Sequence, residues 1–307
     1  MRTIELKQNF LDKIQKILDK EQYFIDEKMA SHVTFAVGGP ADIYLLPGLE
    51  QIADVVKTCT EFEIPVTIIG NGSNLLVGDK GIRGAVIAFG NNMETVTTEG
   101  HCLYAGAGAK LCDAANEAAK YGLTGLEFAS GIPGSIGGAI VMNAGAYGGE
   151  MKDVVKSVSI LTKDGEKREL SLEEMEFSYR HSCIIKNQYF VLGATLQLQE
   201  GCKEEIKAQI KELTNKRESK QPLEYPSAGS TFKRPEGYFA GKLIMDSGLR
   251  GFSVGGAQVS EKHCGFVINK NHATAKDICD LIDEVIRIVY EKQHVKLEPE
   301  VKRIGEF

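Results

Sequence analysis

Apolar residues recur at helical spacing along much of the chain and predict a series of amphipathic helices. Ile52, Val55, Val56 and Cys59 fall at i, i+3, i+4 and i+7, which is the pattern of one buried helix face. Thr274 is suited to cap the start of another such helix. The helices expected from these patterns and their end signals cover about residues 5–20, 49–62, 110–121, 203–219, 238–247 and 274–293.

Short runs of β-branched and apolar residues predict strands between these helices. They cover about residues 41–46, 64–69, 85–89, 96–107, 153–162, 189–199, 254–259, 264–269 and 296–304. Gly100 is expected to make a turn within the fourth strand, and a capping box from Ser171 to Glu174 predicts a short helix between the fifth and the sixth. The pattern is α/β mixed with antiparallel strands, in two or three domains.

The composition is that of an ordinary globular protein. Of the 307 residues, 43% are hydrophobic and 25% are charged, and the net charge is −6. This charge argues against nucleic acid as the main partner. No run approaches the roughly eighteen apolar residues of a membrane helix, and the first residues lack the apolar core of a signal peptide. We therefore expect a cytoplasmic protein without a membrane partner.

The cysteines favour neither a disulfide framework nor a metal site. There are seven, which is an odd number, and no pair has the spacing of a zinc or redox motif. Reduced thiols in a cytoplasm are the simple interpretation. His263 and Cys264 are adjacent, but no further ligand spacing accompanies them, so we expect a structural role for both and no bound metal.

One glycine-rich stretch, Gly125–Gly149, organises the chain. It contains eight glycines and no lysine or arginine. Such a run is unfavourable for helix or strand, because glycine loses the most backbone entropy on ordering. It is typical of backbone that passes close to a cofactor or to another backbone. A tight packing corner or a flexible loop is the alternative, although interleaved apolar residues such as Ile136 and Ile140 argue against a linker.

Two further glycine clusters follow predicted strands. In Gly70–Asn74, successive N–H groups can form a nest for phosphate oxygens, but no Walker lysine follows. Gly106–Gly108 begins like a dinucleotide fingerprint, yet Leu111 stands where the last glycine is required. An ordinary turn explains either cluster alone. One pyrophosphate-containing cofactor bound by backbone groups would explain all three glycine clusters together, without naming that cofactor.

Three polar positions stand out later in the chain. Arg180 lies in an aromatic and polar cluster, Ser230 follows a glycine in a turn, and Glu300 is expected on the terminal strand. Taken singly, each has an ordinary interpretation as a surface ion-pair, turn or solvated residue. Sequence spacing cannot bring them together, because about 50 and 70 residues separate them.

Seven blocks, in order, resemble the family of UDP-N-acetylenolpyruvoylglucosamine reductases, flavoenzymes of peptidoglycan synthesis. The resemblance runs from about Thr34 to Ile304, nearly the full length. Between Ser182 and Val191 there is no room for a long tyrosine-bearing insertion, so the chain is similar to the shorter-looped class. The blocks are Val37–Asp42, Gly70–Val77, Ile132–Gly138, Asn143–Tyr147, Phe177–Arg180, Ala228–Lys233 and Leu297–Val301.

The resemblance implies an α+β chain with an FAD-binding fold of the vanillyl-alcohol-oxidase type and a third, α/β domain for the substrate. This agrees with the absence of a complete Rossmann fingerprint. The implied domains are residues 1–87 together with a returning C-terminal strand at 295–307, residues 88–219, and residues 220–294. The first two would bind FAD, and a monomer is expected.

The implied activity is NADPH-dependent reduction of UDP-N-acetylglucosamine enolpyruvate to UDP-N-acetylmuramate through FAD. Peptidoglycan, and with it cell shape and division, depends on this step. Residue by residue, the family's catalytic set falls on Arg180, Ser230 and Glu300, with Ser230 as the proton donor. Arg180 and Glu300 would act on the substrate carboxylate.

The resemblance also implies binding residues. Those expected to bind the substrate are Tyr179 and, as a hypothesis for its diphosphate, Lys233 or Arg234. Those expected to bind FAD are Gly70, Asn71, Gly72, Ser73, Asn74, Gly131, Pro133, Gly134, Ser135, Gly137 and Gly138.

Two rival functions stay open at this stage. One is an FAD-dependent oxidase of a sugar or hydroxy acid on the same fold, which would show rapid reoxidation of its flavin by oxygen. The other is a non-catalytic module that binds a nucleotide-sugar or a flavin, which would be inert toward NADPH. The pairing of Ser230 with Glu300 alongside the other blocks speaks against the oxidase.

Overall fold

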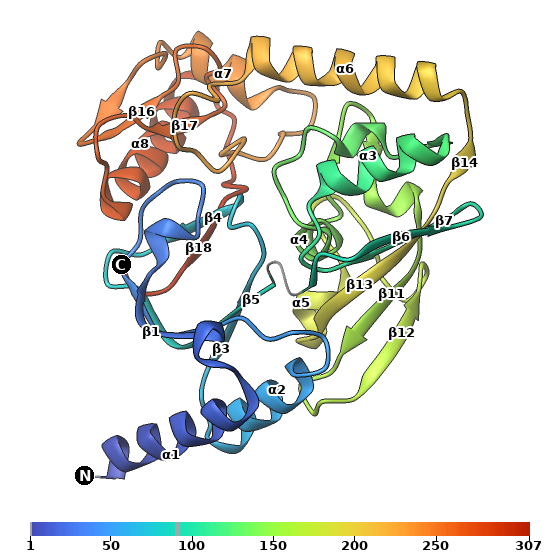
Figure 1. The fold of residues 1–307 in the computed structure, drawn as a ribbon. Coiled ribbons are helices and arrows are strands. Elements are labelled where there is room, and N and C mark those ends of the chain that lie inside the picture. Colours follow the sequence, from blue (N-terminus) through green and yellow to red (C-terminus); the bar gives the residue numbers. More distant parts are fainter. Residues whose placement is uncertain (1, 90–92) are drawn as a thin grey trace. The chain divides into compact units, whose positions relative to one another are not determined.

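The chain divides into two compact units, and the computed structural model describes residues 2–89 and 93–307 of it (Figure 1). Each unit combines segments that are far apart in the sequence and has its own hydrophobic core. Unit 1 comprises Met1–Ile25, Ile43–Asn71 and Gly84–Lys216. Unit 2 comprises Asp26–Asp42, Gly72–Arg83 and Arg217–Phe307. Within the described ranges, no helix has the length and apolar character needed to cross a membrane.

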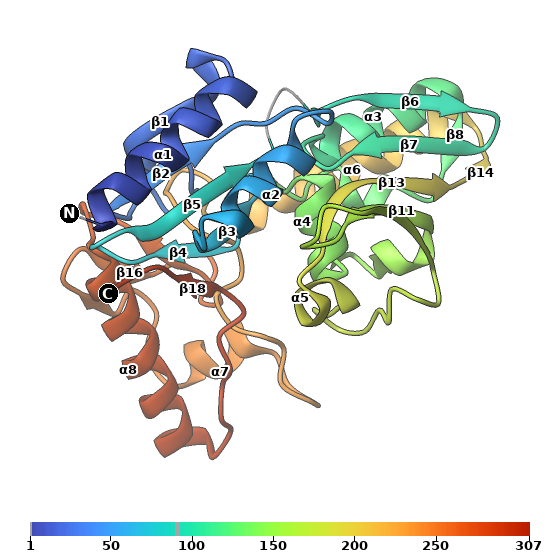
Figure 2. The ribbon, with the colours of Figure 1, turned by 90° about the horizontal axis from the view of Figure 1, so that it is seen from below.

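Five antiparallel strands form the larger sheet of unit 1, in the order β12–β11–β13–β7–β6. Helix α3 (Leu111–Tyr121) packs on β6 and β7, and α4 (Ile136–Met142) packs on β13 and β7 (Figure 2). Gly100 makes the expected turn between β6 and β7, with a φ of +56°. The strands are β6 (Val96–Glu99), β7 (Cys102–Gly106), β11 (Val155–Leu161), β12 (Lys167–Ser171) and β13 (Phe190–Gln197).

A second, four-stranded sheet has the order β1–β2–β5–β3, and its strands β1, β2 and β5 contain residues of both units. Helices α1 (Arg2–Ile17) and α2 (Ile52–Glu61) pack together in unit 1, and the rings of Phe10 and Phe62 meet edge to face at 5.9 Å. The strands are β1 (Tyr23–Lys28), β2 (Pro40–Leu45), β3 (Val66–Ile69) and β5 (Ile82–Ala88).

Unit 2 contains a three-stranded antiparallel sheet covered by the long helix α8 (Ala275–Gln293). The strands are β15 (Ser253–Val254), β16 (Ala257–Val259) and β17 (Val267–Asn269). Helix α7 (Ala240–Asp246) packs against α8. Separately, β18 (Lys302–Ile304) pairs in parallel with β4 (Leu75–Val77), so the end of the sequence lies beside its first quarter.

The remaining elements are short, apart from one long polar helix. They are α5 (Cys183–Asn187), α6 (Lys203–Lys220), β8 (Leu123–Thr124), β9 (Gly145–Ala146), β10 (Gly149–Glu150) and β14 (Gln199–Glu200). Single turns of 3₁₀ helix cover Lys20–Gln22, Met29–Ser31, Glu127–Ala129 and Met151–Asp153.

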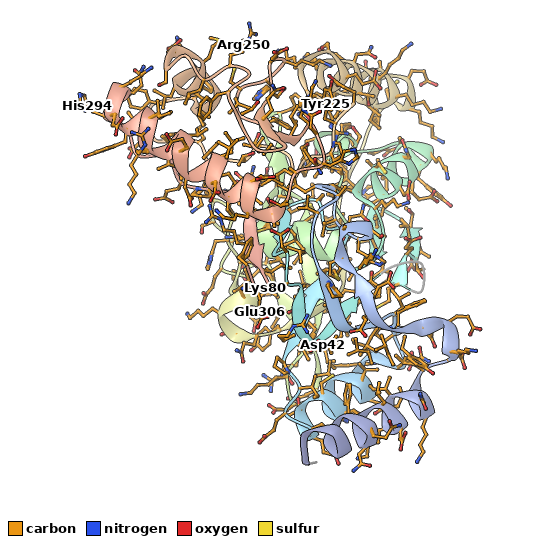
Figure 3. All side chains as sticks on the ribbon, turned by 90° about the vertical axis from the view of Figure 1, so that its left-hand side faces the viewer. Asp42, Lys80, Tyr225, Arg250, His294 and Glu306 are labelled. Atoms are coloured by element: carbon orange, nitrogen blue, oxygen red, sulfur yellow. The ribbon has the colours of Figure 1, made fainter. Side chains whose placement is uncertain are left out.

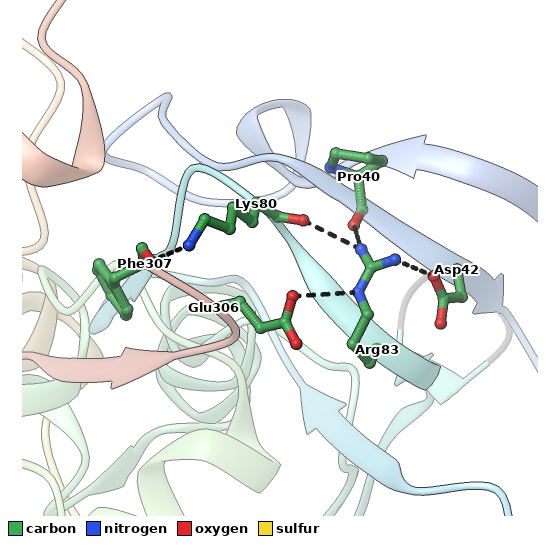
Figure 4. Close-up of polar contacts among 6 residues, drawn as sticks. All are labelled: Pro40, Asp42, Lys80, Arg83, Glu306 and Phe307. Carbon is green, nitrogen blue, oxygen red and sulfur yellow. Dashed lines mark hydrogen bonds and ion pairs between the residues drawn. The ribbon is translucent and has the colours of Figure 1, made fainter.

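Arg83 joins three segments of unit 2. Its guanidinium pairs with Asp42 and lies 3.8 Å from the carboxylate of Glu306 (Figure 4). It also donates to the carbonyl oxygens of Pro40 at 2.9 Å and Lys80 at 3.0 Å. Asp42, Lys80 and Glu306 are located in the whole molecule in Figure 3. Because the guanidinium carries five donors in a rigid fork, one side chain can fix the segment after β18 against the turn before β5.

The helix predicted after Ser171 is wrong, although its capping box forms. The Glu174 N–H donates to Ser171 Oγ at 3.3 Å, and the Ser171 N–H donates to the Glu174 carboxylate at 2.8 Å. Ser171 is the last residue of β12, which the sequence did not suggest, and turns follow it. Glu176 has a φ of +49°, which takes the chain out of the helical region before a second turn of helix can form.

Two strand predictions also differ in detail. The strand expected at 254–259 is a hairpin, because Gly255 and Gly256 separate β15 from β16 and Gly255 has a φ of +52°. Glu300 does not lie on the terminal strand. It precedes β18 by two residues, in an irregular segment.

Thr274 caps α8 as expected, and this cap gives a stability prediction. Its hydroxyl accepts the Asp277 N–H at 3.0 Å, and the Asp277 carboxylate accepts the Thr274 N–H at 3.0 Å. We expect Thr274→Ala to lower the free energy of unfolding by about 1 kcal/mol, measured by urea denaturation. Thr60→Ala is the control, since Thr60 is exposed near the end of α2, where its hydroxyl caps no helix start and instead donates to the Val56 carbonyl at 3.1 Å and to the Lys163 carbonyl at 3.5 Å. Equal losses for the two variants would contradict the capping role.

Candidate functional site

In unit 1, the turn after β3 lies directly against the start of α4. Ser135 is the N-cap of α4, and its hydroxyl accepts the Gly138 N–H at 3.4 Å. A Cβ atom at Gly70 would overlap Ser135 Oγ. The Asn71 side chain donates to the Pro133 carbonyl at 3.2 Å. The structure therefore brings Gly70 and Asn71 to the glycine-rich stretch, although more than sixty residues separate them.

The third glycine cluster packs against the same stretch. The Gly137 N–H donates to the Ala107 carbonyl at 2.9 Å, and a Cβ at Gly137 would lie 3.1 Å from that oxygen. The Leu111 N–H donates to the Gly134 carbonyl at 3.0 Å. Some of the glycines are therefore needed because two backbones approach closely here. This agrees with the alternative explanation of the glycine-rich stretch as a tight packing corner.

These residues fit a phosphate-bearing cofactor. Among the described residues, the N–H groups of Gly134 and Ser135 donate no hydrogen bond within the chain. They lie beside Gly70, where a side chain has no room. Backbone donors at a crowded glycine turn are the groups that bind phosphate oxygens. The arrangement is therefore suited to the diphosphate of a dinucleotide.

The rest of the first glycine loop belongs to unit 2. Gly72 has a φ of +61°, and a Cβ there would overlap the His32 carbonyl oxygen. Asn74 is joined to the C-terminal segment: its carbonyl accepts the Lys302 N–H at 2.9 Å, and its side chain lies 3.4 Å from the Glu300 carbonyl oxygen. Asn74 thus has a structural role beside its predicted cofactor role.

Ser230 and Glu300 are brought together within unit 2 by a short antiparallel ladder. Phe232 pairs with Pro299, and the Glu300 N–H donates to the Thr231 carbonyl at 2.8 Å. Ser230 is exposed and follows Gly229, whose φ is +72°. Glu300 is half-buried. The ladder places Glu300 opposite the residue that follows Ser230, which sequence spacing could not indicate.

Arg180 is described within unit 1, in a tight turn bridged by Ser178 and His181. Its φ is +55°, and its guanidinium stacks on the Tyr179 ring at 5.1 Å. A non-glycine residue with positive φ requires support from its surroundings. Part of that support comes from Asn143, whose side chain donates to the Ser178 carbonyl at 3.2 Å.

Sequence reasoning missed the role of Asn143. This residue is fully buried, ends α4 with a φ of +41°, and also bonds Glu150 and the Lys152 N–H. Asparagine is one of the few residues that adopts this backbone conformation readily. Its place inside the glycine-rich stretch, as the polar residue directly after the apolar run Ile140–Met142, was the available signal.

Lys233 and Arg234 both have partners within unit 2. Lys233 pairs with Glu298, at 3.0 Å between Nζ and the carboxylate. The Arg234 guanidinium stacks on the Phe239 ring at 4.1 Å, and its Nε donates to the Tyr238 carbonyl at 3.3 Å. Both cations lie on the segment that continues from Ser230.

Burial shifts the pKa of several groups, among them one histidine and one cysteine. It lowers the pKa of His263, so the ring is neutral at pH 7 and its Nδ1 can accept the Gly265 N–H at 3.2 Å. It raises the pKa of the Cys59 thiol in α2 to about 12, so that thiol is protonated. All seven cysteines are free, and the described residues include no cluster of side chains able to bind a metal ion.

Comparisons with known proteins place this geometry in a family. A family model described as FAD binding domain matches residues 42–171, and one described as UDP-N-acetylenolpyruvoylglucosamine reductase, C-terminal domain, matches residues 221–304. The UDP-N-acetylenolpyruvoylglucosamine reductase of Agathobacter rectalis is 54% identical over 98% of this chain and 100% of its own length. That of Clostridium perfringens is 53% identical over 96% of this chain and 97% of its own.

Solved structures agree. The chain is similar to the UDP-N-acetylenolpyruvylglucosamine reductase of Thermus caldophilus, with a TM-score of 0.78, 36% identity, and coverage of 92% of this chain and 98% of that one. The grass pollen allergen Phl p 4, which has glucose dehydrogenase activity, shares the fold alone, with a TM-score of 0.50, 13% identity, and coverage of 63% of this chain and 44% of the allergen.

The fold and these matches define an FAD-dependent oxidoreductase with an FAD-binding fold of the vanillyl-alcohol-oxidase type, which confirms the predicted fold class. NADPH is the reductant. The chain belongs to the UDP-N-acetylenolpyruvoylglucosamine reductase family.

Proposed function

We propose that the protein reduces UDP-N-acetylglucosamine enolpyruvate to UDP-N-acetylmuramate in the synthesis of the peptidoglycan precursor, with Arg180, Ser230 and Glu300 as its catalytic residues. Membership of the reductase family is the observation that supports the proposed reaction. The ladder that sets Glu300 opposite Thr231, next to Ser230, is the observation that supports the two unit 2 residues.

When bound, FAD supplies hydride transfer from NADPH to C3 of the enolpyruvyl group. Negative charge then develops on the substrate carboxylate as an enolate, and the Arg180 guanidinium stabilises it. A fixed donor of this kind is worth about 3 kcal/mol in the transition state. Glu300 polarises the same carboxylate. The Ser230 hydroxyl delivers a proton to C2, which completes the addition of one hydride and one proton across the double bond.

Serine is a weak acid, so this role needs a special setting. The enolate carbon is strongly basic, and a hydroxyl fixed beside it avoids the entropic cost of an encounter. The backbone bonds of Thr231 and the turn at Gly229 supply that fixation. Exposure of Ser230 in the described structure leaves its hydroxyl accessible to substrate.

For FAD, we assign the diphosphate and neighbouring groups to the backbone of the glycine turn in unit 1 and to the loop that continues it. The unit 1 residues are Gly70, Asn71, Gly131, Pro133, Gly134, Ser135, Gly137 and Gly138. The unit 2 residues are Gly72, Ser73 and Asn74. Support comes from the crowded backbone at Gly70 and Ser135.

For the substrate, we assign Tyr179 and the cations Lys233 and Arg234. Tyr179 is 54% exposed and stacks on Arg180, so its ring is accessible next to the catalytic cation. Lys233 lies in the ladder that joins Ser230 to Glu300, Arg234 directly follows it, and both could exchange their present partners for a diphosphate.

Domain division, oligomeric state and cellular location are also inferred. We infer three functional domains, at residues 1–87 with 295–307, residues 88–219 and residues 220–294. The pairing of β18 with β4 supports the assignment of the C-terminal strand to the first. We further infer a monomer that works in the cytoplasm, where its nucleotide-sugar substrate and NADPH are found.

Ser230→Ala tests the proton donor. Reduction of the bound flavin by NADPH should keep its wild-type rate, while reoxidation by the enolpyruvyl substrate should slow by several orders of magnitude. Stopped-flow absorbance separates the two half-reactions. Ser253→Ala, at an exposed serine of β15 in the same unit, should change neither. Equal loss of both half-reactions in Ser230→Ala would exclude the proton-donor role, and rapid reoxidation by oxygen without use of the UDP-sugar would favour an oxidase.

Gly70→Ala tests the FAD assignment. The added methyl group overlaps Ser135 Oγ, so the turn must move off the start of α4. We expect the affinity for FAD to fall at least about tenfold, which corresponds to 1.4 kcal/mol, measured by flavin fluorescence titration of the apoprotein. Gly48→Ala is the control, because its Cβ would make an ordinary contact at 3.4 Å. Unchanged affinity in Gly70→Ala would remove this turn from the FAD site.

The pair Lys233→Ala and Arg234→Ala tests the diphosphate contacts. Loss of two cations should raise the KM for the UDP-sugar about a hundredfold, while FAD stays bound. Steady-state kinetics and the flavin spectrum measure the two effects. Lys242→Ala removes an exposed cation of α7 and should leave KM unchanged. An unaltered KM in the double variant would rule out this assignment.

A further inference from the structure

Thr231 uses three polar groups to connect two different segments of unit 2. Its N–H donates to the Gly265 carbonyl at 2.8 Å, and its carbonyl accepts the Glu300 N–H at 2.8 Å. Its hydroxyl accepts the N–H of Val267, the first residue of β17, at 2.9 Å. The side chain therefore takes the place of a backbone carbonyl in the pairing with β17.

The hydrogen bond between the Thr231 hydroxyl and Val267 is buried from solvent. Thr231 and Val267 are both fully buried, so the Val267 N–H has no solvent to replace its partner. A buried donor without an acceptor is costly, and the surrounding backbone shifts to relieve it. Ser230 precedes Thr231 in the chain, and Glu300 is bonded to it, so any such shift moves both residues.

The neighbouring hydrogen bonds show why loss of the Thr231 hydroxyl is expected to displace the whole ladder. Phe232 and Lys233 are held to the C-terminal segment by the bridge to Pro299 and by the Lys233 N–H, which donates to the Glu298 carbonyl at 2.8 Å. These contacts fix the ladder internally. The ladder as a whole is attached to β17 through Thr231, by one backbone bond to Gly265 and one side-chain bond to Val267.

We propose that the Thr231 hydroxyl is a positioning group for the half-reaction in which the enolpyruvyl substrate reoxidises the flavin: it sets the Ser230–Glu300 ladder against β17. Because Thr231 is fully buried, we assign its hydroxyl no contact with substrate or flavin. This inference rests on the proposed roles of Ser230 and Glu300. It goes beyond them by naming the group that fixes their placement.

The test uses the holoenzyme with Thr231→Val, which keeps the shape and removes the acceptor, and Thr231→Ser, which keeps the hydroxyl. In Thr231→Val, flavin reoxidation by the enolpyruvyl substrate should slow about ten- to a hundredfold, the effect of a misplacement of about 1 Å. Reduction by NADPH should be unchanged, and kcat should fall more than KM rises. Thr231→Ser should restore most of the rate.

A second readout does not depend on activity. Loss of the acceptor should increase hydrogen–deuterium exchange at residues 264–269 in Thr231→Val and not in Thr231→Ser. Thr274→Val, which removes a capping hydroxyl at the start of α8 in the same unit, is the matched control and should lower thermal stability without separating the half-reactions. If Thr231→Val does not fold, Thr231→Cys provides a weaker acceptor and should give an intermediate slowing of reoxidation.

Several outcomes would overturn the inference. These are equal slowing of both half-reactions in Thr231→Val, a wild-type rate of reoxidation in that variant, or Thr231→Ser as slow as Thr231→Val. If Ser230→Ala collapses reoxidation while Thr231→Val does not, only the positioning role fails. If Ser230→Ala itself has no selective effect, the proposed catalytic function fails instead.

Discussion

The absence of room for a side chain at a few glycines is the constraint on which the cofactor-binding unit depends. At Gly70 the chain touches the serine that caps α4, and at Gly137 it touches the backbone after β7. These two close contacts join the turn after β3 to α4, and α4 to the larger sheet. The N–H groups of Gly134 and Ser135 lie at the start of α4 beside that turn. The same crowding therefore serves packing and, in the proposed FAD site, would also serve recognition of the cofactor. The turn offers backbone donors without a Walker lysine, in line with the absence of a complete nucleotide fingerprint from the sequence.

The second unit uses a different principle. Its cation and carboxylate side chains are arranged by backbone hydrogen bonds between segments that are distant in the sequence. Thr231 is bonded to Gly265, Val267 and Glu300, so three stretches meet at one buried residue. Arg83 performs a comparable task at the other end of β18 (Figure 4). The exposed Ser230 is thus positioned through the buried Thr231.

Most helices could be predicted because their apolar stripes and caps agree, as at α8 with Thr274. Local signals failed where a later residue decided the outcome: the Ser171 capping box formed, but Glu176 ended the turn. Gly255 likewise divided an apparently continuous strand. The three candidate catalytic residues stood out singly in the sequence, but a joint catalytic role was assigned to them only through family resemblance. The ladder joining Ser230 to Glu300 could not be found from spacing, since backbone pairing between distant segments leaves no periodic pattern in either one.

The parallel pairing of β18 with β4 has a consequence for synthesis of the protein. The two strands are separated by most of the chain, so β4 leaves the ribosome long before its partner exists. Pairing of such distant segments carries a large loop-closure cost and is slow. The residues between Ala85 and Leu198 can reach their native sheet during translation. Glu300 is synthesised after Thr231, so a nascent chain can form the glycine turns of unit 1 well before the ladder between Thr231 and Glu300 exists.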